Sequence, residues 1–216
     1  MIPLRVLLLR RTTPVITVVL IAINLFTLLY ENALPEYAER VFVWRYALIP
    51  DQFHQSSLIT SMFLHGGWFH LIGNMWFLWV FGSYLEEALG AARYLAFYLI
   101  SGVASALVQL FVSLGSSVPT VGASGAIAGV MGAFLYMYPR ARVITLVFFI
   151  FITTVELPAA FMLLYWFAIQ LVSGLGSLTI RTQGQGIAWF AHVGGFLAGL
   201  LFVRLFAQRR LGPRYW

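Results

Sequence analysis

The stretch WFHLIGNMWFLWVFGSYL, residues 68–85, contains no Asp, Glu, Lys or Arg and ends at Glu86 and Glu87. A run of about 20 mainly apolar residues is long enough to cross the hydrocarbon core of a bilayer as an α-helix. His70 and Asn74 are polar, and polar side chains inside a span are costly unless they pair or serve a function. The stretch therefore predicts a membrane-spanning helix whose polar residues need an explanation.

The composition of the whole chain agrees with a membrane protein. Of its 216 residues, 61% are hydrophobic and only 9% are charged, whereas an average soluble domain carries about 25% charged residues. These values exclude the soluble globular and the disordered classes. The absence of cysteine excludes disulfides, iron–sulfur clusters, Cys-ligated zinc and thiol catalysis.

The charge-free runs predict a single all-α membrane domain over residues 1–216, a polytopic bundle of six transmembrane helices. The expected spans are about 14–30, 68–85, 94–114, 122–138, 157–172 and 187–207. Charges alternate with aromatic rings in residues 31–57, which predicts a loop in the membrane interface. Residues 143–155 are apolar but too short to span, which leaves a re-entrant segment, an interfacial segment or a helix extension. Residues 173–186 are rich in Gly, Ser, Thr and Gln, which predicts a loop.

The net charge of +6 comes entirely from arginine, because the chain has no lysine. An even number of spans places both termini on one side, and the positive-inside rule makes the arginine-rich side cytoplasmic. That side would hold Arg5, Arg10, Arg11, Arg93, Arg140, Arg142, Arg204, Arg209, Arg210 and Arg214, against Arg40, Arg45 and Arg181 on the other. We therefore expect a multi-pass protein of the cell membrane with both termini in the cytoplasm. The lipid bilayer, not nucleic acid, accounts for the positive charge.

Two further motifs lie at the same outer depth of the predicted bundle as His70. GASG, residues 122–125, opens the fourth expected span, and AHVGG, residues 191–195, lies in the outer half of the sixth. Taken alone, Ser124 also suits a helix cap or a packing contact, and His192 suits a hydrogen bond to a carbonyl. Glycines flank both residues, so the two helices can approach until the hydroxyl reaches the imidazole. A separation of about 2.6–3.2 Å is what an activated nucleophile requires.

His70 and Asn74 are four residues apart and share one helix face. They suit interhelical hydrogen bonds or, together with the N–H of Ser124, an oxyanion hole. His65 lies off that face, and we expect it to cap the loop or the helix in a structural role. No acidic residue accompanies these histidines and HExxH is absent, so neither a metal nor another cofactor is expected. A hydrolase built from these residues would use a Ser–His dyad, because no carboxylate lies at the same depth.

In this order and topology the motifs resemble those of the rhomboid family of intramembrane serine proteases. The resemblance covers about residues 44–204 and rests on HGGWFHLIGN (65–74), FGSYLEEALG (81–90), GASG and AHVGG. It implies a six-helix core with the active site in a water-filled cavity that opens to the non-cytoplasmic side. It also implies that Ser124 is the nucleophile and His192 the general base.

The resemblance assigns supporting roles to further residues. His70 and Asn74 match the oxyanion-stabilising pair of the family. Gly122 and Gly125 flank the nucleophile in its Gly-x-Ser-Gly motif, and Glu86 is the centre of a structural Gly-xxx-Glu-xxx-Gly pattern. The chain as a whole is similar to the minimal bacterial form of the family.

Two further segments match the family, and one residue near the nucleophile differs from it. Residues 31–57 match its membrane-embedded first loop, and residues 157–172 match its proposed lateral gate. Some members carry an aromatic residue four positions after the nucleophile, stacked on the base, but this chain has Ala128 there. What orients the ring of His192 is therefore open.

The resemblance implies an enzyme that hydrolyses peptide bonds in or near transmembrane segments of other membrane proteins, without a cofactor. Two alternatives stay open. A non-catalytic rhomboid-like binder would hold membrane-protein clients without cutting them. A transporter would need polar groups in both halves of the membrane, whereas here they cluster in the outer half. The sequence indicates neither the substrate nor the oligomeric state.

Overall fold

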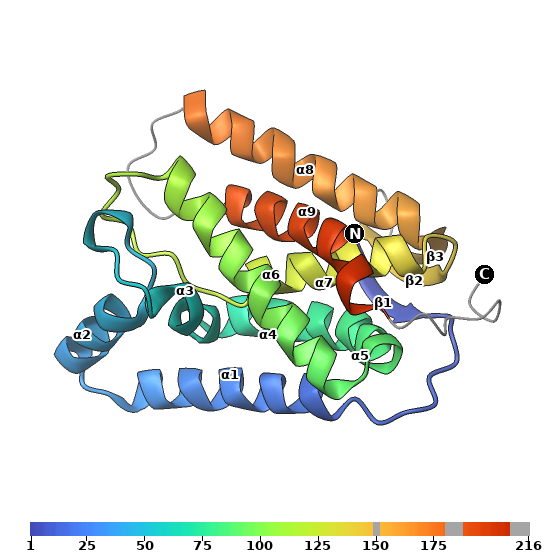
Figure 1. The fold of residues 1–216 in the computed structure, drawn as a ribbon, viewed down its shortest axis with the longest axis horizontal. Helices are drawn as coiled ribbons and strands as arrows, with labels where there is room; N and C mark the ends of the chain where they lie inside the picture. Colours follow the sequence, from blue (N-terminus) through green and yellow to red (C-terminus); the bar gives the residue numbers. More distant parts are fainter. Residues whose placement is uncertain (149–151, 180–187, 208–216) are drawn as a thin grey trace.

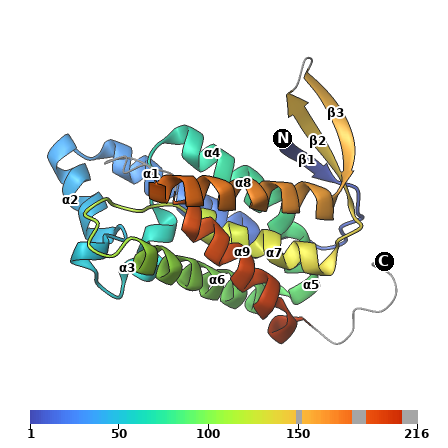
Figure 2. The same cartoon turned by 90° about the horizontal axis from the view of Figure 1, so that it is seen from above.

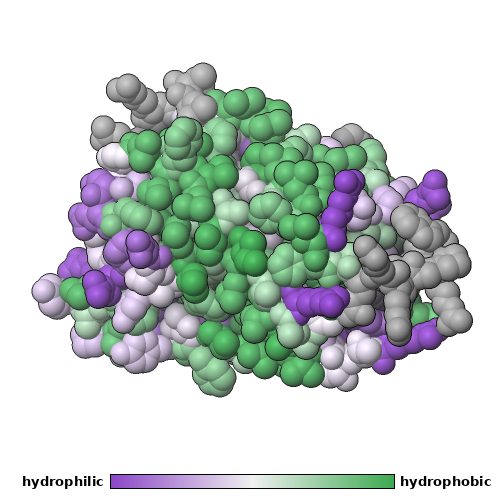
Figure 3. Space-filling model, in the orientation of Figure 1, coloured by the Kyte–Doolittle hydropathy of each residue, from purple (hydrophilic) through white to green (hydrophobic). Residues whose placement is uncertain are grey.

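The computed structural model describes residues 1–148, 152–179 and 188–207, and most of them lie in helices (Figure 1). Long helices form because apolar runs in lipid must satisfy every backbone N–H and C=O within the segment. Within these described ranges four helices are long and apolar enough to cross a membrane: α1 (Val15–Ala33), α6 (Ala91–Val112), α8 (Ala159–Thr179) and α9 (Trp189–Phe206). In Figure 3 a hydrophobic belt covers the middle of the visible face, with hydrophilic residues toward both ends.

The other two expected spans take a different form. Residues 68–89 are helical throughout, but α4 (Trp68–Phe77) and α5 (Ser83–Leu89) are separated by a π-helical stretch, η3 (Leu78–Gly82). The fourth expected span is the 14-residue helix α7 (Ser124–Met137). At 1.5 Å per residue α7 is roughly 21 Å long, shorter than the roughly 30 Å hydrocarbon core. Among the described residues, four of the six predicted spans are therefore single α-helices of membrane-crossing length.

The short helix α7 is buried along most of its length, because glycines let its neighbours approach closely. A Cβ at Gly195 of α9 would overlap the carbonyl oxygen of Gly125, and a Cβ at Gly199 would overlap that of Gly129. The backbones of α7 and α9 are therefore in direct contact, as small residues allow between membrane helices.

The described part of residues 143–155 forms β-strands, which excludes the helix extension among the three alternatives, and the all-α fold class needs a corresponding correction. Residues 143–148 and 152–155 lie in strands β2 (Arg142–Phe148) and β3 (Ile152–Pro158), which pair antiparallel with Thr145 opposite Val155; residues 149–151 lie outside the described residues. A third strand, β1 (Ile2–Val6), pairs antiparallel with β2, so the order is β1-β2-β3. The segment is rich in Val, Ile and Thr, which favour strands, and the third strand adds the pairing that an isolated hairpin lacks.

Two predicted loops contain more helix than expected. The predicted interfacial loop, residues 31–57, includes the end of α1, helix α2 (Glu36–Tyr46) and the short turn η1 (Pro50–Gln52). Two short helical turns follow, α3 (Ser57–Thr60) and η2 (Ser61–Phe63). Helix α8 runs to Thr179, so the loop prediction is wrong for residues 173–179, and residues 180–186 lie outside the described residues.

The two ends of the bundle differ in their secondary structure (Figure 2). Helices α2 and α3 lie at one end, and the β-sheet lies at the other. Helix α7 begins on the side of α2 and α3 and ends next to β2, only a few residues before Arg142. Ser124 and the sheet are therefore at opposite ends of α7.

Glu86, on α5, connects that helix to the start of α1. Its carboxylate accepts hydrogen bonds of 2.8 Å from the backbone N–H of Ile16 and from both the N–H and the hydroxyl of Thr17. The first N–H groups of a helix have no partner within the helix, and a carboxylate there also interacts favourably with the helix dipole. Gly90, four residues later, has φ +81° and ends α5, which accounts for part of the glycine pattern around Glu86.

The contact between α7 and α9 predicts a sharp difference between two glycine-to-alanine variants. Gly199→Ala should lower the free energy of unfolding by about 1–3 kcal/mol, because the new methyl group must displace the backbone of α7. Gly73→Ala is the control, since a Cβ there meets nothing within 4 Å and alanine favours a helix by about 0.5–1 kcal/mol. Thermal unfolding in detergent measures both; equal melting temperatures for the two variants would contradict the close contact.

Candidate active site

The turn before α7 places Ser124 at the first position of the helix. Gly122 has φ +125°, a conformation that residues with a side chain rarely adopt, and its N–H donates a 2.9 Å hydrogen bond to the carbonyl of Ser61. Ala123 already has helical dihedral angles, so the helix starts immediately afterwards. The N–H of Ser124 is therefore among the groups that have no acceptor within the helix.

The structure brings Ser124 and His192 together, although they are far apart in the sequence. The hydroxyl oxygen of Ser124 lies 2.7 Å from Nε2 of His192, and both side chains are partly exposed. Two features support this contact. Gly125 leaves room for the side chain of Ser105 on α6, and the Ser105 hydroxyl donates a 2.7 Å hydrogen bond to the carbonyl of Ala191. The residue before His192 is thus fixed to a third helix.

The second ring nitrogen of His192 has a partner on α8. Its Nδ1 lies 2.7 Å from Oε1 of Gln170, and a carbonyl oxygen can only accept a hydrogen bond. Nδ1 therefore carries the proton in the neutral ring, and Nε2 accepts a hydrogen bond from the Ser124 hydroxyl. This is the tautomer that a general base for serine requires.

Neither Gln170 nor Trp166 was predicted from the sequence. The Trp166 ring lies 5.8 Å from the His192 ring, centroid to centroid, with 36° between their planes. The two α8 residues are four positions apart and share one helix face. Gln170 is 6% exposed, and an amide in an apolar span is the kind of signal that could have revealed it.

His70 and Asn74 lie beside the turn that precedes Ser124. A Cβ at Gly122 would be 2.9 Å from Nε2 of His70 and 3.6 Å from Nδ2 of Asn74. The N–H of Gly66 points to Nδ1 of His70 at 3.4 Å, so the other nitrogen, Nε2, is the one that carries the proton toward Gly122. Two side-chain donors from α4 therefore converge on the start of α7.

His65 is buried behind these donors and is in contact with both of them. The amide of Asn74 donates a 3.0 Å hydrogen bond to Nε2 of His65, and the ring of His70 packs edge-on at 5.1 Å. Burial is the main cause that lowers the pKa of His65 to about 4. The ring is therefore neutral at pH 7, and its Nε2 can accept the hydrogen bond from the Asn74 amide.

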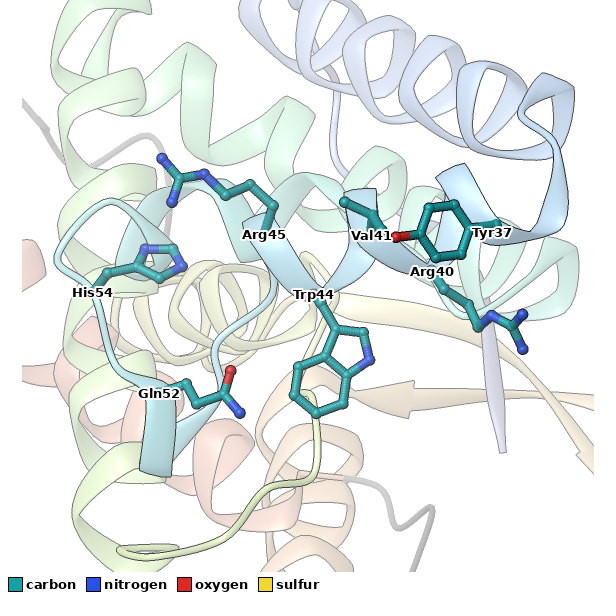
Figure 4. Close-up of a pocket in the computed structure, with 7 residues that line it drawn as sticks. All are labelled: Tyr37, Arg40, Val41, Trp44, Arg45, Gln52 and His54. Atoms are coloured by element: carbon teal, nitrogen blue, oxygen red, sulfur yellow. The ribbon is translucent and has the colours of Figure 1, made fainter.

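A separate hollow of about 550 Å³ lies on the predicted interfacial loop (Figure 4). Its lining residues are Tyr37, Arg40, Val41, Trp44, Arg45, Gln52 and His54. None of them is among the residues around Ser124. Within the described ranges no group of three or more His, Asp or Glu side chains is arranged to hold a metal ion.

Comparison with known proteins shows the relationships of the chain. Residues 51–209 match the Rhomboid domain. Rhomboid protein 1, mitochondrial, of Saccharomyces cerevisiae is 32% identical over 172 residues, which cover 74% of this chain and 45% of the yeast protein. The Presenilin-associated rhomboid-like protein, mitochondrial, of Homo sapiens is 32% identical over 157 residues, 68% of this chain and 37% of the human protein. RHOMBOID-like protein 6, mitochondrial, of Arabidopsis thaliana is 35% identical over 149 residues, 66% of this chain and 40% of that protein. The chain spans less than half the length of these relatives.

The buried His65 predicts that acid destabilises the fold. The unfolded chain takes up a proton on this ring below about pH 6.5, whereas the folded ring does so only near pH 4. The stabilisation is complete above pH 6.5 and is lost as the pH falls toward 4, at about 1.4 kcal/mol per pH unit.

The measurement is thermal unfolding of the native protein and of His65→Gln between pH 7.5 and 4.5. The difference in melting temperature between the two should be constant above pH 6.5 and should shrink below it. Parallel curves over the whole range would contradict a neutral, buried His65.

Proposed function

The chain belongs to the rhomboid family, and we propose that it is a serine endopeptidase that hydrolyses peptide bonds in or near transmembrane segments of other membrane proteins. The observation that supports this most directly is the 2.7 Å separation between the Ser124 hydroxyl and Nε2 of His192. A serine hydroxyl is a weak nucleophile on its own and becomes effective when an adjacent base accepts its proton.

The first half of the proposed reaction forms an acyl-enzyme. The Ser124 oxygen attacks the carbonyl carbon of the scissile peptide while its proton moves to Nε2 of His192. The tetrahedral intermediate collapses when the imidazolium gives this proton to the leaving amine. In the second half, His192 takes a proton from a water molecule that attacks the ester, and the new carboxylate is released. No cofactor takes part in these steps.

Three donors are available for the oxyanion of the tetrahedral intermediate. They are the N–H of Ser124 at the start of α7, Nε2–H of His70 and the amide of Asn74, the last two lying beside Gly122. The unpaired N–H groups at a helix start also favour negative charge. Loss of one such donor typically costs about 3–4 kcal/mol in the transition state.

The length of α7 supports a site below the membrane surface. Helix α7 is roughly 21 Å long, and its last residues lie near the sheet at one end of the bundle. If that end lies at one face of a roughly 30 Å hydrocarbon core, the first residue of α7 stops short of the other face. A substrate helix hides its carbonyls in its own hydrogen bonds, so it must unwind locally before Ser124 can attack. We expect cleavage near Gly or Pro, which destabilise helices, and at a position with a small side chain.

For the orientation we propose that both termini face the cytoplasm and that Ser124 faces the opposite side of the cell membrane. Arg5 and Arg142 lie in the sheet and Arg140 lies just before it, and the positive-inside rule favours such arginines on the cytoplasmic face. The relatives compared above are named as mitochondrial proteins. Protease accessibility of tags at the two faces, in membranes of the native host, tests both the orientation and the membrane.

Removal of the nucleophile is the direct test of the proposed activity. Purified Ser124→Ala and His192→Ala variants in liposomes should each cleave a fluorogenic transmembrane substrate at least about 1000-fold more slowly than the native protein. The double variant should be no slower than either single variant, because the two residues act as one unit.

Ser101→Ala is the matched control. Ser101 is a buried serine on α6 whose hydroxyl has no hydrogen-bond partner in the described part of the chain, and its variant should keep the native rate. Cleavage by Ser124→Ala at the native rate would refute the assignment. A native protein that binds the substrate without cutting it would instead indicate a non-catalytic binder.

A further inference from the structure

The base of the proposed dyad depends on α8 for the contacts that fix its ring. Ala128, four residues after Ser124, is fully buried and too small to stack on the imidazole of His192. The imidazole instead lies near the indole of Trp166, with 36° between the ring planes, and its Nδ1 is hydrogen-bonded to Gln170. From α9 itself, Trp189 meets the imidazole edge-on at 6.4 Å.

We propose that Gln170 is the positioning residue of the dyad: its carbonyl oxygen holds His192 in the tautomer and orientation that accept the Ser124 proton. This inference rests on the proposed function, since it gives Gln170 a task only if His192 acts as a base. Gln170 does not touch the substrate. It acts through the imidazole, from a helix that contributes neither member of the dyad.

The hydrogen-bond chemistry of the amide explains why this residue type suits the position. An imidazole held by a single hydrogen bond to serine can turn or exchange its proton between the two nitrogens. An acceptor 2.7 Å from Nδ1 favours the ring form with the proton on Nδ1, which leaves the lone pair of Nε2 toward Ser124. When His192 takes up the serine proton, the same carbonyl dipole faces the imidazolium and stabilises its charge. A glutamine does this without placing a second ionised group in the membrane, where charges are costly.

Packing restricts the amide as well as the ring. Gln170 is 6% exposed, and Trp166 lies one turn away on the same face of α8. The indole of Trp166 limits the space into which the imidazole can turn. The hydrogen bond to Gln170 fixes the direction in which Nδ1 points. Together they supply from α8 the support that an aromatic side chain at position 128 would supply from α7.

The test uses a small fluorophosphonate, which reports on the dyad without requiring entry of a transmembrane substrate. The Ser124 oxygen attacks phosphorus, a P–O bond forms, the P–F bond breaks, fluoride leaves, and the serine proton passes to Nε2 of His192. Gln170→Met keeps the length of the side chain and removes the acceptor. It should react about 10- to 100-fold more slowly than the native protein, because it retains the base but not its orientation. On the transmembrane substrate, kcat should fall by a similar factor while KM stays within about twofold.

Two further variants separate positioning from simple loss of packing. Gln170→Glu keeps an acceptor oxygen at the same reach and should react at least about tenfold faster than Gln170→Met. Gln109→Met removes an amide that contacts α9 at the N–H of Ala191, at 3.2 Å, but not the imidazole, and it should keep the native labelling rate. Equal rates for Gln170→Met and Gln170→Glu would overturn the proposal, as would equal loss in Gln109→Met.

A spectroscopic measurement on the native protein tests the same inference without a variant at Gln170. With 15N in the histidine rings, the chemical shifts show which nitrogen carries the proton, and the His192→Gln spectrum identifies the signals of His192. We expect the proton on Nδ1, and a proton on Nε2 would refute the proposal. The two hypotheses fail separately: a native protein that does not label at Ser124 refutes the proposed function, whereas normal labelling of Gln170→Met refutes only the role of Gln170.

Discussion

The direct contact between the backbones of α7 and α9 is the constraint on which the site depends. A hydroxyl and an imidazole are short side chains, and they reach hydrogen-bond distance only if their helices approach more closely than ordinary side chains allow. Gly125 and Gly129 on α7, and Gly195 and Gly199 on α9, provide that approach. The same lack of side chains lets the neighbouring helices bury α7 along most of its length.

The residues around Ser124 and His192 come from different helices, and each helix makes a distinct contribution. Helix α6 fixes the backbone before His192 through Ser105, and α4 brings His70 and Asn74 beside Gly122. His65 is buried behind them and accepts a hydrogen bond from Asn74. Helix α8 holds the imidazole through Gln170 and Trp166. The arrangement places polar side chains next to one another, which offsets the cost of burying each one.

Local features of the sequence predicted this arrangement better than they predicted the complete fold. Ser124 and His192 could be paired in advance because each lies in a run of glycines, and glycines on two apolar helices indicate a close approach. The sheet could not be predicted in the same way. Residues 143–155 lack a strict alternation, and their partner strand, Ile2–Val6, is more than a hundred residues away, so the pairing depends on tertiary structure. The contact between Gln170 and His192 was also missed: an amide in an apolar span marks a residue that needs a partner, but it does not indicate which helix carries that partner.

The position of α8 at one edge of the bundle gives the contact with His192 a mechanical consequence (Figure 1). A hydrogen bond of 2.7 Å is lost when its partners separate by about 1 Å. Any outward swing of this peripheral helix would therefore release the imidazole before it opened a passage wide enough for a polypeptide. On the proposed mechanism, the dyad would therefore be fully assembled only while α8 is packed against α9.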